Sequence, residues 1–379
     1  MSSIQTPVPG PLRAVQVLGA TAAAHVCSLA GGLAARGVEV TVCGPAEVMD
    51  AYGMCGTGAR FAPVETAAPP GPRTDAMAVA ALRSACAGAD VVHAHGLRAG
   101  LLTSLALPRM RRPALVVTWH GGKQSGGARS AMTRLLERRV ARTATVVLGA
   151  SSDLVDRVRA LGARDVRLAP LSFPAPRTEA DRPAEDTERM HRKIREELGA
   201  ADRPLIVAVG RLEPDQGHGL LLDAALRWRA LDPQPLVAVA GEGRRRQALQ
   251  RRIDAEELPV RLLGRRDDLA DLLTAADLVV LAGRGGAHPL IAQEALYAGA
   301  PLVATASGGL PELVGEAAVL VPDKDADALA GAVASLIADP GRRERLSAAG
   351  RVQAASWPTE DDMVAQVLSV YDELASRRP

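Results

Sequence analysis

Two segments in the second half of the chain combine residue types that bind phosphate and hydroxyl groups. Arg211 follows the apolar run 205–209 and precedes a predicted helix start, so a guanidinium and free backbone N–H groups could both face a diphosphate. In the second segment, Pro289 suits the first position of a helix, and Glu294 lies further along that helix, where it could accept hydrogen bonds from a ribose diol. The alternatives are an ordinary loop with a solvated arginine and a solvated helix carboxylate.

Three histidines in the first half lie on or beside predicted strands. His93 and His95 are two residues apart, so both imidazoles share one strand face and could point toward a cleft. A metal site would need a third ligand, which the sequence does not supply, so we expect one ring to pack and the other to line the cleft. His120 lies at the end of another predicted strand, shortly before Lys123, where doubly wound sheets place their sites; a structural histidine is the alternative.

Composition excludes several classes of protein. Lys and Arg total 45 against 43 Asp and Glu, and aromatic residues make up only 2%, which disfavours nucleic-acid binding. The four cysteines form no C-x-x-C pair and complete no zinc set, so no metal is expected. The chain shows no signal-peptide pattern and no apolar run of transmembrane length, which predicts a cytoplasmic protein. The G-x-G-x-x-G dinucleotide fingerprint is missing after the first predicted strand.

The elements that position these residues follow from short apolar runs that alternate with amphipathic segments. Such runs are typical of parallel strands covered on both faces, and the alternation predicts right-handed βαβ units in doubly wound sheets. The runs are 14–18, 38–43, 91–94, 115–119, 145–148, 166–169, 205–209, 236–240, 260–263, 278–281, 302–304 and 318–321.

The distribution of charge divides the chain into two predicted domains. Residues 1–170 carry a net charge of +9 and residues 171–379 a net charge of −7. A Pro-rich, charged stretch over 171–192 indicates a linker, and the second domain is predicted over 193–357. Two such domains would face each other across a ligand-binding cleft.

The chain resembles the family 4 glycosyltransferases of the GT-B fold from about residue 13 to 371. The matching pieces are 90–96 and 118–120 in the first half, and 209–212, 240–243, 263–265, 276–278, 293–295, 299–301 and 308–313 in the second. The resemblance implies two Rossmann-like domains, with a C-terminal helix over 358–379 that crosses back to the first. It also implies a retaining, hexosyltransferase-like enzyme that uses a nucleotide diphosphate sugar, without a metal or other cofactor.

The resemblance assigns roles to the candidate residues. Arg211 would hold the donor diphosphate and stabilise the leaving charge, the helix start marked by Pro289-Leu290 would give backbone N–H donors to the same phosphates, and Glu294 would bind the ribose. His120 would lie near the transferred sugar. The remaining candidates are Gln216 and Gly264 on the donor side and Gly19, His93, His95 and Lys123 on the acceptor side.

Three departures from the family pattern keep other functions open. Gln216 stands where the family usually has lysine, Gly286 where it usually has glutamate, and Gly19 is followed by an Ala-rich turn instead of a Gly-rich one. Because such contacts stabilise the transition state, the alternatives are an impaired GT-B protein that acts as a binding or partner subunit, or a GT-B cleft recruited for different chemistry.

The sequence leaves the acceptor open among a small molecule, a glycan and a lipid-linked molecule. Arg134, Arg138, Arg139 and Arg142 lie on one predicted helix. Such a cluster is usually a solvated face; the alternative is a basic surface for anionic acceptors or lipid head groups, and therefore peripheral membrane contact.

Overall fold

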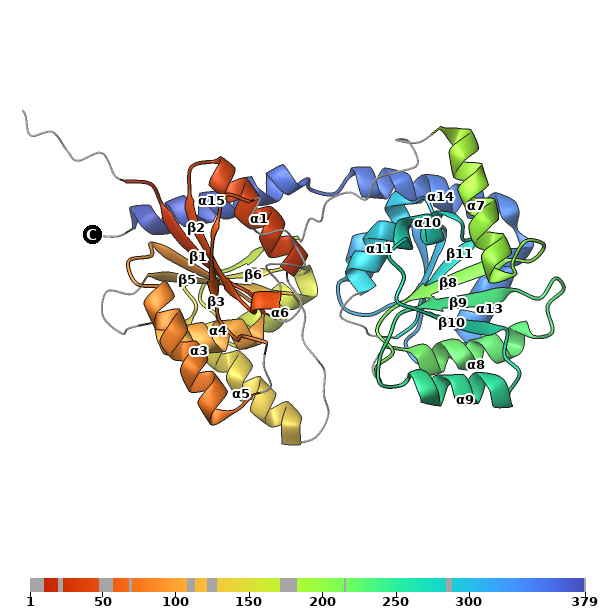
Figure 1. Cartoon of the computed structure of the whole chain (residues 1–379), viewed down its shortest axis with the longest axis horizontal. Helices are drawn as coiled ribbons and strands as arrows, with labels where there is room; N and C mark the ends of the chain where they lie inside the picture. Colours follow the sequence, from red (N-terminus) through yellow and green to blue (C-terminus); the bar gives the residue numbers. More distant parts are fainter. Residues whose placement is uncertain are drawn as a thin grey trace, which may run out of the picture. The chain divides into compact units, whose positions relative to one another are not determined.

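The protein is described by a computed structural model that covers residues 10–19, 23–47, 57–67, 70–107, 113–120, 128–170, 183–214, 216–283 and 288–377 (Figure 1). The chain forms two compact units. Unit 1 contains Met1–Pro174 and Pro358–Pro379, and unit 2 contains Ala175–Trp357. The last segment of the sequence therefore belongs to the same unit as the first.

Unit 1 is built on a seven-stranded parallel sheet with the order β3-β2-β1-β4-β5-β6-β7. Its central strands are nearly fully buried because their apolar residues are covered on both faces. The strands are β1 (Arg13–Val17), β2 (Glu39–Gly44), β3 (Arg60–Pro63), β4 (Val91–His95), β5 (Ala114–Trp119), β6 (Val146–Gly149) and β7 (Val166–Leu168).

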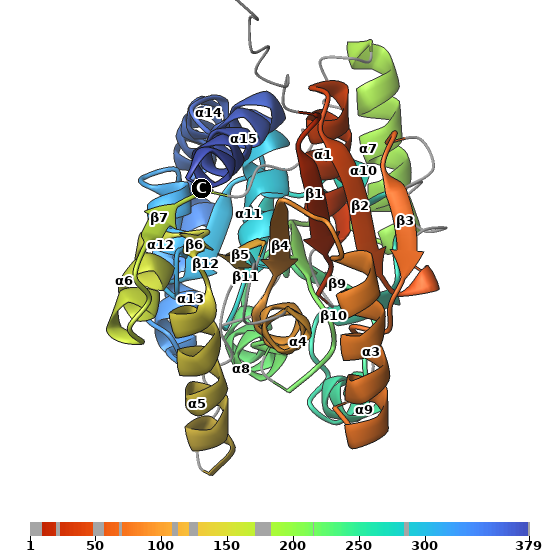
Figure 2. The ribbon, with the colours of Figure 1, turned by 90° about the vertical axis from the view of Figure 1, so that its left-hand side faces the viewer.

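Helices cover both faces of this sheet (Figure 2). Helices α1 (Ala23–Ala35) and α15 (Glu360–Ser376) pack on one face, and their apolar side chains form a core with alternate residues of the strands. The opposite face carries a second core under α3 (Pro72–Ala85), α4 (Leu97–Ala106), α5 (Ala128–Thr143) and α6 (Ser152–Ala160).

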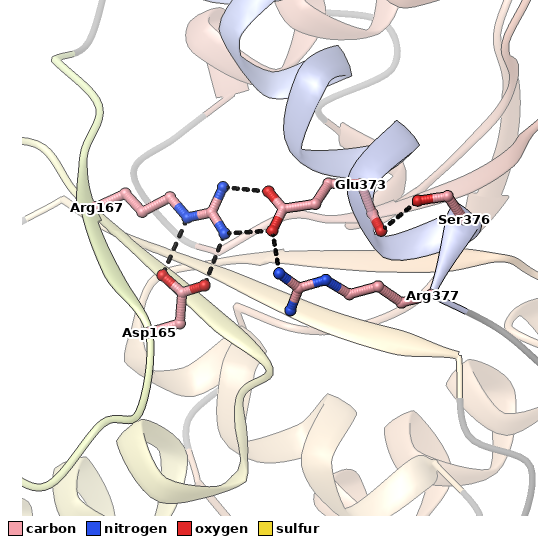
Figure 3. A network of polar contacts seen from close by, with 5 residues as sticks. All are labelled: Asp165, Arg167, Glu373, Ser376 and Arg377. Atoms are coloured by element: carbon pink, nitrogen blue, oxygen red, sulfur yellow. Dashed lines mark hydrogen bonds and ion pairs between the residues drawn. The ribbon is translucent and has the colours of Figure 1, made fainter.

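Polar contacts fasten the end of α15 to the sheet edge (Figure 3). The Arg167 guanidinium on β7 binds Asp165 on one side and both carboxylate oxygens of Glu373 on the other, at 2.6–3.1 Å. Arg377 also pairs with Glu373, which is the third ion pair of this network. These hydrogen bonds lower the pKa values of Asp165 and Glu373, so the network is charged at neutral pH.

Unit 2 contains a six-stranded parallel sheet with the order β10-β9-β8-β11-β12-β13. The chain order reverses between β8 and β11, so the loops after these two strands diverge at a topological switch point, where open sheets of this kind bind ligands. The strands are β8 (Leu205–Val209), β9 (Leu236–Ala240), β10 (Val260–Gly264), β11 (Leu278–Leu281), β12 (Leu302–Thr305) and β13 (Ala318–Val321).

Two helical layers enclose the sheet of unit 2 (Figure 1). One core lies under α8 (His218–Trp228), α9 (Arg246–Ala255) and α13 (Ala326–Ala338). The other lies under α7 (Ala184–Leu198), α10 (Leu269–Thr274), α11 (His288–Tyr297), α12 (Leu310–Val314) and α14 (Pro340–Ala355). Each unit is thus a doubly wound α/β layer structure, which confirms the predicted fold class.

The structure differs from the sequence-based prediction in two elements. Strand β3 is missing from the predicted runs because it is a four-residue edge strand whose side chains are only partly buried. The predicted linker over 171–192 is wrong for residues 184–192, which begin α7. The apolar residues Met190, Ile194 and Leu198 recur at helical spacing and pack into the core of unit 2. Burial of this face stabilises a helix although most residues of the segment are charged or polar. Residues 171–182 lie outside the described residues.

Within the described ranges, no helix is both long enough and apolar enough to cross a bilayer.

Candidate functional site

The candidate histidines of unit 1 lie on the sheet face covered by α1 and α15. His93 and His95 on β4 are 0% and 1% exposed, and Gln16 on β1 pairs with His93 across the sheet. Both ring nitrogens of His93 are hydrogen bonded, to Tyr371 and Thr118, whereas the Nδ1 atom of His95 is buried without a partner among the described residues. Both rings are therefore packed, and the expectation that one of them lines a cleft is wrong, because β4 is covered by α1 and α15. His95 differs from His93 in keeping a buried polar atom without a partner in the described part of the chain.

The structure gathers four imidazoles into one cluster. His95 stacks on His93 and on His120, with ring centroids 4.2 Å and 5.6 Å apart. The ring of His25 on α1 meets His95 and His120 edge-on at 5.6 Å and 5.5 Å. The candidate residues of the sequence analysis omit His25, because a single histidine in an Ala-rich helix carries no local signal for such a contact.

Burial decides the protonation state of this cluster. Desolvation, reinforced by repulsion between neighbouring imidazoles, holds the pKa of His120 at about 3 and those of His93 and His95 well below their ordinary value. These three rings are consequently neutral and act as hydrogen-bond donors and acceptors. No three His, Cys, Asp or Glu side chains in the described part of the chain are placed to hold a metal ion together.

Gly19 lies where β1 ends beside β4. A Cβ atom at this position would lie 2.3 Å from the backbone oxygen of His95, so only glycine permits this approach of the two chains. Gly19 therefore sets the spacing beside the histidine cluster. Of the predicted Ala-rich turn, residues 20–22 lie outside the described residues, as does Lys123, whereas Ala23 and Ala24 form the start of α1 and not a turn.

The loops after β8, β9 and β11 pack backbone against backbone at one edge of the unit 2 sheet. A Cβ atom at Gly241 would lie 1.9 Å from the Gly210 oxygen, and one at Gly217 would lie 1.9 Å from the Ala282 oxygen. The hydroxyl of Thr305 donates a 2.6 Å hydrogen bond to the Gly283 carbonyl and ties β12 to the same edge. The role of these glycines is not predicted from the sequence, although Gly241 lies within one of the segments that resemble the family.

Arg211 extends from this edge with an exposed side chain. The Nε2 atom of His218 donates a 3.0 Å hydrogen bond to the Arg211 carbonyl and holds the loop. The nearby carboxylate of Glu213 is already paired with Arg244 at 2.7 Å. Within the described residues, the Arg211 guanidinium has no hydrogen-bonded carboxylate, so its charge is available for an anion.

Glu294 lies on α11, which follows β11 at the same sheet edge. Its Oε2 atom is buried and has no hydrogen-bond partner in the described part of the chain, and burial raises the pKa of this carboxyl. An unpaired buried carboxylate oxygen is costly unless a ligand satisfies it. Glu294 is the residue that the sequence predicts for this kind of contact.

The other donor-side candidates lie around the same edge. Helix α11 begins at His288, so Pro289 is its second residue and Leu290, which is half-buried, its third. Gly264 ends β10 with a φ of +78°, a conformation that favours glycine. The half-buried Gln216 lies near Gly210 at the end of β8. Gly286 lies outside the described residues.

The four arginines named on the predicted helix lie on α5 and are exposed. Met132 and Leu135 lie among them with 63% and 67% of their surface exposed. Glu137 on the same helix is buried and pairs with Arg157 at 2.8 Å. The exposed face of α5 over residues 131–143 is therefore basic and partly apolar, with no exposed carboxylate.

Two family models match the chain. Residues 190–353 match the model described as glycosyl transferases group 1, and residues 20–174 match the model described as glycosyl transferase 4-like domain. The two matches fall in unit 2 and unit 1, respectively.

Curated relatives and solved structures agree with these models. The chain is 31% identical over 261 residues to a GDP-mannose-dependent alpha-(1-6)-phosphatidylinositol monomannoside mannosyltransferase of Mycolicibacterium smegmatis, across 61% of this chain and 65% of the relative. It is 30% identical over 312 residues to a D-inositol 3-phosphate glycosyltransferase of Xylanimonas cellulosilytica, across 76% of this chain and 73% of the relative. The structure of Anabaena HepE in complex with UDP and glucose superposes with a TM-score of 0.78 at 18% identity, covering 95% of this chain and 99% of HepE.

Proposed function

Because the chain belongs to the family 4 glycosyltransferases of the GT-B fold, we propose that it transfers a sugar from a nucleoside diphosphate sugar to an acceptor with retention at the anomeric carbon. The chain is a glycosyltransferase; the donor, the acceptor and the stereochemistry are the proposal. Relatives named for GDP-mannose and a structural neighbour crystallised with UDP support a nucleoside diphosphate as the leaving group.

The observation that carries the proposal is a pair of unused charges on the segments that follow β8 and β11, the two strands at the switch point of unit 2. Glu294 keeps a buried carboxylate oxygen without a partner among the described residues, and Arg211 keeps a guanidinium without a hydrogen-bonded carboxylate there. A nucleoside diphosphate satisfies both, since its ribose hydroxyls donate to a carboxylate and its phosphate oxygens accept from a guanidinium. The backbone N–H groups at the start of α11 add donors for the same phosphates.

In the proposed reaction, the bond between the sugar C1 atom and the diphosphate oxygen breaks as the acceptor oxygen bonds to C1 on the same face. The departing phosphate oxygen takes the acceptor proton. Arg211 and the start of α11 stabilise the charge that develops on the diphosphate, and a neutral His120 hydrogen-bonds the transferred sugar. These groups supply the positive charge of the site, so the proposed mechanism needs no metal or cofactor.

Calorimetric titration with UDP, GDP, ADP and TDP tests the donor site. Arg211→Ala should weaken binding of the matching nucleotide by roughly 10- to 150-fold, the loss of a charge-assisted hydrogen bond. Arg251→Ala is the matched control, because Arg251 is an exposed arginine on α9 of the same unit. Equal affinities of the wild type and the Arg211 variant would refute the assignment.

His120→Ala separates binding from transfer. We expect this variant to keep its nucleotide affinity and to lose transfer, because His120 belongs to unit 1 and the proposed nucleotide contacts to unit 2. A loss of nucleotide affinity in a folded variant would place His120 in the nucleotide site and overturn this division.

The position of Gln216 favours a second candidate function, a protein that binds the nucleotide but turns it over slowly or not at all. The neutral amide of Gln216 lies near Gly210, just beyond the end of β8, and the family usually has a lysine at the Gln216 position. Gln216→Lys should tighten diphosphate binding in either case. Nucleotide binding by the wild type without turnover of the matching sugar would favour the partner function.

The basic, partly apolar face of α5 favours a lipid-linked acceptor, with the enzyme bound at an anionic lipid surface. Exposed arginines attract lipid phosphates, and Met132 and Leu135 can enter the acyl boundary between them. A relative named for a phosphatidylinositol mannoside acceptor is consistent with this choice among acceptors.

A further inference from the structure

A continuous chain of hydrogen bonds runs along the covered face of the unit 1 sheet, from the C-terminal helix to the histidine cluster. The Tyr371 hydroxyl on α15 lies 2.7 Å from His93 Nδ1 and 2.7 Å from Gln16 Nε2. Gln16 Oε1 lies 2.8 Å from His95 Nε2, and His93 Nε2 lies 2.6 Å from the Thr118 hydroxyl. All five side chains are at most 2% exposed.

The donor and acceptor groups allow only one direction for this series of hydrogen bonds. The Gln16 carbonyl oxygen only accepts, so His95 Nε2 carries the proton, and the Gln16 amide donates to the Tyr371 oxygen. The single hydroxyl hydrogen of Tyr371 is then left for His93 Nδ1. Because burial keeps both imidazoles neutral, His93 carries its one proton on Nε2 and donates it to Thr118.

The direction of the chain determines which atom of His95 is left unused. With its proton on Nε2, neutral His95 keeps Nδ1 as an acceptor, and this atom is buried without a partner among the described residues. The ring stacks on His120, whose Nε2 atom is also buried and unpartnered in that part of the chain. Two unused, buried ring nitrogens thus lie in neighbouring rings of one cluster.

We propose that Tyr371 is a positioning residue of the transferase site: through Gln16 it holds His95 in the Nε2–H tautomer and so keeps the buried Nδ1 atom unprotonated, as an acceptor for a substrate hydroxyl that enters beside His120. The functional part of this inference rests on the proposed function, which places His120 at the transferred sugar. Loss of the Tyr371 hydroxyl should change the His95 tautomer in one direction. Without this hydroxyl, the Gln16 amide can rotate and donate its N–H to His95 Nε2. The ring proton of His95 then moves to Nδ1, which can no longer accept a hydrogen bond.

Nitrogen-15 NMR of the histidine rings in the full-length protein tests the tautomers without any substrate. In the wild type, His93 and His95 should both show the Nε2–H pattern. Tyr371→Phe, which removes only the hydroxyl, should shift both rings toward a mixture with the Nδ1–H form. Gln16→Leu should shift His95 alone, because the bond between Tyr371 and His93 remains. Val367→Ala is the packing control, since Val367 is buried on α15 but takes no part in these hydrogen bonds.

Transfer kinetics test the functional part. Tyr371→Phe and Gln16→Leu should lower kcat by about tenfold or more, as for other residues that orient a histidine, and leave nucleotide affinity within about twofold. Val367→Ala should change neither. An unchanged His95 pattern in Tyr371→Phe, the same shift in Val367→Ala, or a changed tautomer with wild-type kcat would each overturn the inference. If the wild type transfers no sugar, the proposed function fails, and the NMR result alone decides whether Tyr371 positions His95.

Discussion

Replacing Glu294 with glutamine is expected to weaken nucleoside diphosphate binding about 30- to 150-fold. The carboxylate has one buried oxygen without a partner among the described residues, and a ribose diol can donate two hydrogen bonds to it. Glutamine keeps one acceptor oxygen but replaces the other with an NH₂ group, so one charge-assisted bond is lost and the second is weakened. At about 1.5–3 kcal/mol for a bond to a charged group, the total loss is about 2–3 kcal/mol.

A double-mutant cycle between protein and ligand isolates this contact. The affinities of the wild type and the Glu294→Gln variant are measured by calorimetry for the matching nucleotide and for its 2′,3′-dideoxy analogue. If Glu294 holds the ribose, the variant should lose affinity for the natural nucleotide and show almost no difference for the analogue. Losses that simply add would refute the ribose contact.

The pH dependence of nucleotide affinity tests the contact between Glu294 and the ribose independently. Burial raises the pKa of Glu294 in the free protein, and the ribose needs the ionised form, so affinity should fall as pH drops through this raised pKa. The variant should lack this part of the pH dependence, which separates it from titration of the nucleotide itself. In the nucleotide-free protein, a raised folded-state pKa means stability that is lost as pH rises; the variant should therefore be the more stable protein at neutral pH.

Three further changes test unit 1. Gly19→Ala should cost about 1–3 kcal/mol of unfolding free energy, since its Cβ atom would lie 2.3 Å from the His95 oxygen and the two strand ends must separate; urea unfolding measures this. Arg167→Ala should lower stability at neutral pH more than in acid. Its carboxylate partners have lowered pKa values, so the stability they contribute is lost as pH falls, which urea midpoints along a pH series will show. Reversing Arg138 and Arg142 to glutamate should reduce binding to anionic vesicles by about 30-fold or more, at about 1 kcal/mol for each arginine near the surface; co-sedimentation measures this.

Each of these results has a contrary outcome. Wild-type stability of the glycine variant would mean that β1 and β4 do not approach as described. A pH-independent loss in the Arg167 variant would assign the network a packing role. Equal vesicle binding by the α5 variant and by a variant with two exposed arginines of unit 2 reversed would exclude α5 as the lipid-contacting face.

The sequence by itself determines the two parallel sheets. Every strand of unit 2 coincides with a predicted apolar run to within one residue, because a strand covered on both faces must be apolar at consecutive positions, which is a local property. The same signal misses β3, since an edge strand is covered on fewer sides. It also hides the first turns of α7, where a charged face dominates the composition.

The sequence also identifies the charged groups at the edge of unit 2. Arg211 and Glu294 follow strands of a predictable sheet, and the ends of parallel strands meet at a common edge, so their proximity to that edge follows from topology. The sequence pattern does not show which of these charged groups already have a hydrogen-bond or ion-pair partner. Only the folded structure shows that Glu294 keeps a buried oxygen without a partner among the described residues and that Glu213 is occupied by Arg244.

The histidine cluster of unit 1 was decided by tertiary structure alone. The spacing of His93 and His95 placed both on one strand face, but their partners come from α1 and from α15, and Tyr371 lies 278 residues from His93 along the chain. No local pattern links such positions, because the direction of a hydrogen-bond chain depends on which donor meets which acceptor after the last helix has packed onto the sheet. The protonation pattern of the site is therefore a property of the fold. The sequence offers His93, His95 and His120 as candidates but gives no signal for Gln16 or Tyr371, which direct their hydrogen bonds.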